Sequence, residues 1–266
     1  MQPNADQTLK WSPEWAPVFY QRLTELSALP LKPEMGIGFP GAVVWPETSV
    51  PFLLNEADPF LPEIAAAAGA PVLAGIQRGE GGRWYNSLAE FTAEGAIGPV
   101  YDKFHLVPFG EYIPFADLFR GLGIASLSTM VEGYSPGEAA ATIQLQTAPP
   151  FAPLVCYEIV YPRFAPRGDR RPAWIANLSN DAWFGPTAGP RQHLNIARFR
   201  AIEEGLPVAR AASGGWSGVI DSLGRTEALI RPDAEGAFDF DLPAARRPTL
   251  YAQWGNALAF AFWGCA

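Results

Sequence analysis

The chain has 266 residues, of which 48% are hydrophobic, and it carries a formal net charge of −8. It can bury one sizeable core, and it offers no basic cluster to follow a phosphate backbone, so we expect one compact domain and no nucleic-acid partner. With two cysteines, two histidines and neither a Cys-x-x-Cys nor a His-Glu-x-x-His motif, we expect no disulfide framework, metal site or cofactor.

Apolar runs bounded by glycine or proline alternate along the chain with segments of helical periodicity. Buried strands are predicted at residues 42–45, 71–76, 154–156, 174–177 and 207–211. Helices are predicted at about 13–28, 58–69 and 189–204, the last of them ending at Gly205. Strands that alternate with helices predict an α/β fold in which helices cover a sheet.

An acidic residue follows the first of these strands. Glu47 stands just beyond the carboxyl end of the strand at 42–45, where α/β sheets collect their active-site groups. A carboxylate in that place can take a proton from a thiol. A lone glutamate more often serves as a helix N-cap or a loop acid, so its position leaves both interpretations open.

The segment 101–112 places a lysine and a histidine, Lys103 and His105, among aromatic and apolar residues. Lysines usually lie on solvated surfaces, so Lys103 between Tyr101 and Phe104 suggests an ammonium held away from water. Such a charge can stabilise an oxyanion and favour a thiolate.

A cysteine ends the strand predicted at 154–156. A strand that delivers a thiol into a turn is one way in which folds present a nucleophile, so Cys156 is the candidate nucleophile. Free cysteine is also among the most buried residue types, and a small apolar side chain in the core is the competing interpretation. Glu47, Lys103 and Cys156 are far apart in the sequence, and their spacing does not show whether they meet.

The contexts of these three residues resemble the carbon–nitrogen hydrolase (nitrilase) superfamily. The matching stretches are 45–47, 101–112, 155–158 and 177–185, of which 103–111 and 180–185 are long and specific. The resemblance covers nearly the whole chain, and within the superfamily it points to the apolipoprotein N-acyltransferases, a family of bacterial inner-membrane enzymes. One departure is the turn 212–216, where the family often has a Thr-Asn-Thr-Gly-like sequence.

This resemblance implies a nitrilase-like α-β-β-α sandwich at residues 1–247, truncated at its first strand, and the start of a transmembrane segment at 248–266. It assigns Glu47 as the general base, Lys103 as the group that stabilises the tetrahedral intermediate and Cys156 as the nucleophile. Other family positions support the site by orienting Lys103 or by lining the acyl-binding wall. In this chain they are Glu111, Tyr157, Glu158 and Trp183.

The activity that the resemblance implies is transfer of a fatty acyl chain from a phospholipid, through a cysteine thioester, to the diacylglyceryl-cysteine of an apolipoprotein. The implied setting is the bacterial inner membrane, with a monomeric catalytic domain that faces the periplasm. One alternative is a soluble amidase of the same superfamily, in which water replaces the acceptor amine. A second is an inert interaction domain in which the three residues are remnants.

Two loops have the composition that a lipid substrate would favour. Residues 112–124 are apolar for a loop, and 182–186 hold aromatic residues between helix breakers. Such residues suit a membrane interface, although loops of this kind more often fold over the core as covers. The apolar tail at 254–266 is too short to span a bilayer, so it is either a packed helix or the first half of a transmembrane segment.

Overall fold

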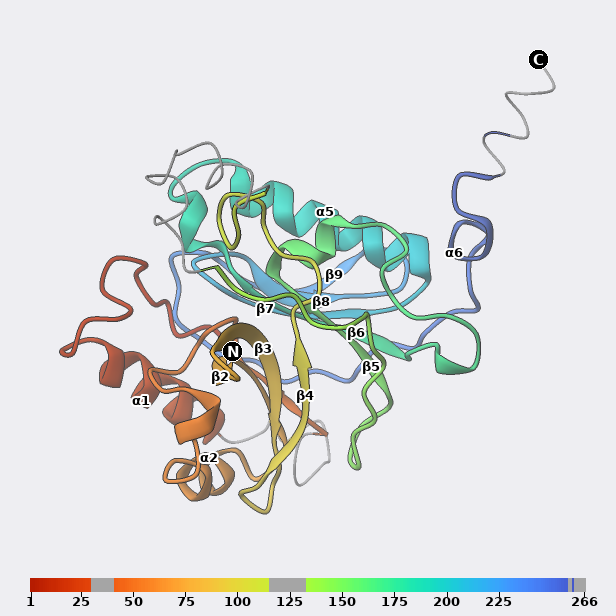
Figure 1. The fold of residues 1–266 in the computed structure, drawn as a ribbon. Coiled ribbons are helices and arrows are strands. Elements are labelled where there is room, and N and C mark those ends of the chain that lie inside the picture. Colours follow the sequence, from red (N-terminus) through yellow and green to blue (C-terminus); the bar gives the residue numbers. More distant parts are fainter. Residues whose placement is uncertain (30–40, 115–132, 258–259, 261–266) are drawn as a thin grey trace, which may run out of the picture.

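The computed structural model describes residues 1–29, 41–114, 133–257 and 260, and two β-sheets form its centre (Figure 1). The first sheet contains, in spatial order, β1 (Val43–Val44), β2 (Val72–Glu80), β3 (Arg83–Phe91) and β4 (Ile97–Asp102). The second contains β5 (Phe151–Val155), β6 (Trp174–Asn180), β7 (Val208–Ser213), β8 (Ser217–Ile220) and β9 (Thr226–Ile230). Parallel pairing joins β1 to β2 and β5 to β6 to β7, whereas the other neighbours are antiparallel.

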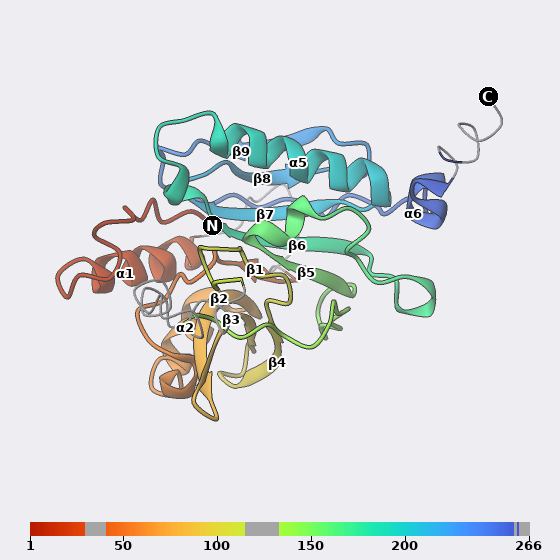
Figure 2. The ribbon, with the colours of Figure 1, turned by 45° about the horizontal axis from the view of Figure 1, so that its top comes forward.

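Helices cover the outer faces of both sheets. They are α1 (Ala16–Ser27), α2 (Leu61–Ala68) and α5 (Gly189–Glu204), whereas the short α6 (Leu250–Trp254) contacts α5 and lies to the side of the sheets. Short 3₁₀ turns are η2 (Leu54–Glu56), η3 (Cys156–Val160), η4 (Gly168–Arg170) and η5 (Asp181–Phe184). Figures 1 and 2 show α1 and α2 outside the first sheet and α5 along the outer face of the second, with the two sheets between them. The layers therefore follow the order α-β-β-α, and the predicted fold class is confirmed.

Three apolar cores hold these layers together. The first lies between α1, α2 and the first sheet and includes Ile64, and the middle one, between the sheets, includes Leu73. The third lies between the second sheet and α5 and includes Leu194. Because successive side chains of a strand point to opposite faces, β5 contributes Val155 to the middle core and Leu154 to the third. This burial on both faces explains the unbroken apolar runs in the sequence.

All five predicted strands and all three predicted helices are present, and α5 has the predicted bounds. Gly69 and Gly205 end α2 and α5 in the left-handed conformation, with φ of 58° and 66°. The structure adds β3, β4, β8 and β9, which the apolar runs do not indicate. Of these, β4 and β9 are edge strands and expose many of their side chains, so they lack a continuous apolar signal.

Among the helices in the described residues, none combines the length and the apolarity that a bilayer crossing requires. The loop predicted at 112–124 lies outside these residues from position 115 onward, and the segment predicted at 248–266 lies partly outside them. The carboxyl ends of β1 and β5 and the adjoining ends of β4 and β6 carry the candidate site.

Candidate active site

Glu47 lies in a turn that follows β1, and only 6% of the residue is exposed. The turn packs directly on β2, where the Gly75 N–H donates to the Pro46 carbonyl (3.1 Å) and the Ser49 N–H donates to the Gly75 carbonyl (2.8 Å). A Cβ at Gly75 would lie 2.4 Å from the Glu47 Cα, so only glycine permits this approach. The backbone of β2 thus fixes the position of the Glu47 turn relative to the first sheet.

Both carboxylate oxygens of Glu47 have partners, and these come from both sheets. Oε1 accepts from Asn86 Nδ2 on β3 at 2.7 Å and lies 3.5 Å from Lys103 Nζ. Oε2 accepts from the backbone N–H of Asn180, at the end of β6, at 2.8 Å. The Glu47 carboxylate therefore links the first sheet, through Asn86, to the second sheet, through Asn180.

Lys103 follows β4 and is 1% exposed. Its Nζ donates to Glu111 Oε1 at 2.8 Å, and Asn86 Nδ2 donates to the same oxygen at 3.0 Å. Burial acts to lower the pKa of Lys103, but the charges of Glu47, the Cys156 thiolate and Glu111 outweigh it and raise the pKa above its ordinary value. The side chain remains a fixed ammonium under ordinary conditions.

Cys156 stands where β5 ends and η3 begins. Its φ is 50°, a left-handed conformation that is uncommon for a residue with a Cβ. Burial and the Glu47 charge raise the pKa of the thiol to about 12, while Lys103 and a hydrogen bond with Ser179 act in the opposite direction. The charges of Glu47 and Lys103 therefore both act on the thiol. The raised pKa keeps the thiol protonated at rest, so its reaction requires a base.

Glu158 links the segment that contains Lys103 to the turn that contains Cys156. Its Oε1 accepts from the Tyr101 hydroxyl (2.8 Å) and from the N–H groups of Phe104 (2.7 Å) and His105 (3.0 Å). Its Oε2 accepts from the N–H of Val155 at 2.7 Å. The fully buried carboxyl thus holds the backbone immediately after Lys103 and immediately before Cys156.

A buried ion pair lies behind the cysteine. Arg210 Nη2 donates to Asp181 Oδ2 at 2.6 Å, and neither side chain is exposed. Asp181 Oδ1 accepts from the Ser179 hydroxyl at 2.6 Å and lies 2.8 Å from His193 Nδ1. Burial acts to raise the pKa of Asp181, but the Arg210 guanidinium and the His193 hydrogen bond hold it well below its usual range.

The same arginine also reaches the backbone of β5. Arg210 Nη1 donates to the side-chain oxygen of Asn177, whose Nδ2 donates to the Leu154 carbonyl at 2.8 Å. Arg210 is therefore connected by hydrogen bonds to Ser179, through Asp181, and to the backbone of β5, through Asn177.

The remaining predicted residues lie around this centre. Glu111 pairs with Lys103, as given above. The Tyr157 ring packs edge-on against Tyr161 with 5.4 Å between ring centroids. Trp183 and Phe184, in η5, are 74% and 42% exposed. This loop therefore does not fold over the core as a cover, which is the arrangement that composition favours.

Several residues of the site were not predicted from the sequence as site residues. They are Lys10, Asn86, Ser179, Asn180, Asp181 and Arg210. One signal was available, because β6 alternates apolar residues with Asn177 and Ser179 although the strand is buried throughout. A buried polar residue is more informative than an exposed apolar one, since it needs a partner. In the part of the chain that the structure describes, no cluster of three His, Cys, Asp or Glu residues could hold a metal ion.

The sequence and the structure both have relatives among known proteins. A family model described as carbon-nitrogen hydrolase matches residues 41–252. Two curated apolipoprotein N-acyltransferases, from Rhodopseudomonas palustris and Bradyrhizobium diazoefficiens, are 39% and 38% identical to this chain over 96% and 97% of its length. These alignments cover 50% of each relative, so the chain spans about half the length of the curated relatives it matches.

Solved structures share the fold at low sequence identity. An amidase from Nesterenkonia sp. has a TM-score of 0.62 and 17% identity, covering 99% of this chain and 94% of its own. The carbon–nitrogen hydrolase superfamily protein XC1258 from Xanthomonas campestris has a TM-score of 0.58 and 21% identity, with 96% and 92% covered. At this level of identity the likeness concerns the fold alone.

Proposed function

Because the chain belongs to the carbon–nitrogen hydrolase family, as its motifs predicted, we propose that it is the catalytic part of an apolipoprotein N-acyltransferase. The acyl donor would be a phospholipid, and the acceptor would be the N-terminal diacylglyceryl-cysteine of an apolipoprotein. The proposed location is the bacterial inner membrane, with the site facing the periplasm. The supporting observation is the identity of 36–40% to proteins of that name over 91–96% of this chain.

In the first half-reaction, Glu47 takes the proton of the Cys156 thiol, and the sulfur forms a bond to the ester carbonyl carbon of the phospholipid. The negative charge that develops on the carbonyl oxygen is stabilised by the Lys103 ammonium. The ester C–O bond then breaks, the leaving lysophospholipid oxygen takes the proton from Glu47, and a thioester remains on Cys156. A thiol with a pKa near 12 makes this base necessary.

In the second half-reaction, the α-amine of the acceptor attacks the thioester carbonyl and gives a proton to Glu47. The C–S bond breaks as the amide forms, and the sulfur recovers the proton from Glu47. Glu111 would hold Lys103 in place through both steps, since its carboxylate is 2.8 Å from the ammonium. Trp183, largely exposed beside the site, would contact the lipid.

The second candidate is the soluble amidase that the resemblance left open; an amidase shares this fold, although the fold alone does not assign an activity. In that case water would replace the acceptor amine and the thioester would be hydrolysed. The much higher identity to the acyltransferases supports the first candidate.

The two candidates differ in what accumulates on the sulfur. When the chain is given phospholipid vesicles without an acceptor, we expect intact-protein mass spectrometry to show one added acyl mass. Neutral hydroxylamine should remove this mass, and Cys156→Ser should not acquire it. Turnover of small amides to acid and ammonia without an acyl adduct would instead favour the amidase.

The assigned roles make a further expectation for this assay. Cys156→Ala, Glu47→Gln and Lys103→Met should each abolish the adduct while the circular dichroism spectrum stays unchanged. Since the three groups would act as a unit, a double variant should be scarcely worse than a single one. Near-normal acylation in a single variant would remove that residue from the proposed mechanism.

A further inference from the structure

A second buried lysine reaches the site from the N-terminal segment. Lys10 is 6% exposed, and its Nζ donates to the Glu47 carbonyl at 3.2 Å and to the Thr48 hydroxyl at 2.9 Å. Both of these acceptors are neutral oxygens, in contrast to the carboxylates around Lys103. An ammonium is strongly hydrated, so its burial against neutral oxygens is costly and needs an explanation.

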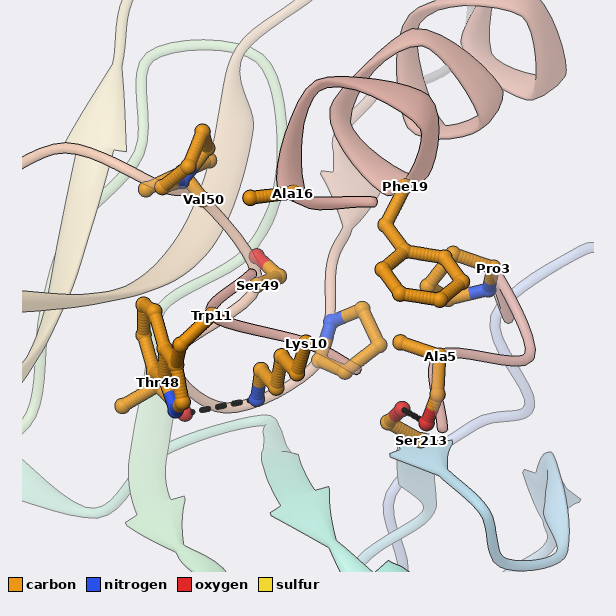
Figure 3. Close-up of a pocket in the computed structure, with 12 residues that line it drawn as sticks. Pro3, Ala5, Lys10, Trp11, Ala16, Phe19, Thr48, Ser49, Val50 and Ser213 are labelled. Carbon is orange, nitrogen blue, oxygen red and sulfur yellow. Dashed lines mark hydrogen bonds between the residues drawn. The ribbon is translucent and has the colours of Figure 1, made fainter. Parts of the chain in front are cut away.

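The residue that Lys10 contacts has a strained backbone. Thr48 has a φ of 44°, and the left-handed region is unfavourable for a β-branched side chain. Such a conformation persists only where its surroundings hold it. Below the turn, the Ser49 N–H donates to the Gly75 carbonyl at 2.8 Å. From the other side, Lys10 holds the Thr48 hydroxyl (Figure 3).

The space around Lys10 is too small for a substrate. The cavity beside it has a volume of about 10 Å³, which is room for about one water molecule. Apolar groups line most of it, including Phe19 of α1 and Val50 (Figure 3). Lys10 is therefore enclosed behind the Glu47 turn and does not line an open binding site.

We propose that Lys10 is a positioning residue for Glu47: its ammonium fixes the strained Glu47–Thr48 turn so that the carboxylate stays directed at Lys103 and Cys156. This inference rests on the proposed role of Glu47 as the base. It adds a contact to the backbone of the base, beside the contacts that its carboxylate makes. The charged groups that act on Lys10 are Glu47 and the Cys156 thiolate, and burial lowers the pKa of Lys10 to about 8.

The test measures alkylation of Cys156 by iodoacetamide from pH 6 to pH 9, in a Cys265→Ser background so that one thiol remains. With Glu47 in place to take the proton, we expect a nearly flat rate across this range. In Lys10→Met we expect the Glu47 carboxylate to be displaced, so that hydroxide must remove the proton of the Cys156 thiol. The rate should then rise about tenfold per pH unit and lie at least tenfold below wild type at pH 7.

A rescue variant separates positioning from charge. Glycine adopts a φ of 44° without strain, so Thr48→Gly should recover most of the rate that Lys10→Met loses and restore the flat pH profile. Arg83→Met, which removes an exposed cation at the start of β3, serves as the matched control and should change neither the rate nor its pH dependence. Thr48→Val, which removes only the hydroxyl acceptor, should show a smaller loss in the same direction and replaces Lys10→Met if that variant does not fold.

The outcomes are distinct. A wild-type rate and a flat profile in Lys10→Met, or in Thr48→Val where it replaces that variant, would overturn the inference and leave the proposed function standing. A loss that Thr48→Gly does not recover would show that the charge alone matters, which also overturns it. An unreactive Cys156 in the wild-type chain would overturn both proposals together.

Discussion

Replacement of Glu158 by glutamine tests how a buried carboxyl holds the two halves of the site. Glu158→Gln keeps the side-chain shape, and its amide oxygen can still accept the three donors that now reach Oε1. The new amide NH₂ then faces the N–H of Val155, which is 2.7 Å from Oε2 in the wild-type chain. In the variant, the amide NH₂ and the Val155 N–H would both be donors and could not pair. The variant would also lack the buried negative charge of the ionised Glu158 carboxylate.

The unpaired N–H lowers the free energy of unfolding of the variant, whereas the loss of the buried charge raises it. Only the second effect depends on pH, so measurements at two pH values separate them. A buried N–H without a partner lowers the free energy of unfolding by about 1–3 kcal/mol at any pH. Burial raises the pKa of Glu158 from 4.5 to about 7, so the folded chain binds this proton more tightly than the unfolded one. The stability from that proton is complete below pH 4.5 and is lost as the pH rises through 7, a change of about 3 kcal/mol.

Glu158→Gln should therefore be less stable than wild type by about 1–3 kcal/mol at pH 5, and at pH 8 it should be as stable as wild type or more stable by up to about 2 kcal/mol. Urea unfolding, followed by tryptophan fluorescence at both pH values, measures the difference in free energy of unfolding between the two chains. The pH dependence of titratable groups that both chains share cancels in this difference. Tyr101→Phe is the control, because it removes a donor from the ionised carboxylate and should cost most at pH 8. A loss of stability in Glu158→Gln that stays constant, or grows toward pH 8, would refute this reasoning.

Three further outcomes are expected. Asp181→Asn should lower the free energy of unfolding by about 3–5 kcal/mol in urea, because it leaves the buried Arg210 without its counter-charge; a loss below about 1 kcal/mol would contradict this. Gly75→Ala should slow iodoacetamide alkylation of Cys156 about tenfold or more while the circular dichroism spectrum stays intact, since the added Cβ displaces the Glu47 turn; an unchanged rate would show that the turn absorbs it. Trp183→Ala should leave stability within about 0.5 kcal/mol but weaken flotation with phospholipid vesicles, and a large loss of stability would mean that the indole packs on the protein.

The sequence was informative where burial is continuous and where a residue type is out of place. The strands β1, β2, β5, β6 and β7 were predicted because they are apolar on both faces, whereas β3 also lies between two cores but carries polar residues that interrupt its apolar run. Lys103 was singled out by its aromatic neighbours, and it is almost completely buried. The edge strands β4 and β9 were missed because they bury too little to leave a continuous apolar run.

The supporting contacts could not be predicted, for a physical reason. Lys10 contacts Thr48 only because the chain returns to the same point after β1, and no local pattern encodes that return. Asp181, directly after β6, pairs with Arg210 on β7. This ion pair can be predicted only when the register of the two parallel strands is known. The assignment of Glu47, Lys103 and Cys156 as one catalytic set came from family resemblance.

The division of the site between two sheets has a consequence for folding. Each sheet is formed by a continuous part of the chain, residues 43–102 for one and 151–230 for the other. Glu47 lies in the first part and Lys103 directly follows it, whereas Cys156 and Ser179 belong to the second. Each half can gain its local hydrogen bonds early, but neither contains a base beside a thiol. Reactivity at Cys156 should consequently be the last property to appear during refolding, when the two halves dock, and the first to disappear when they separate.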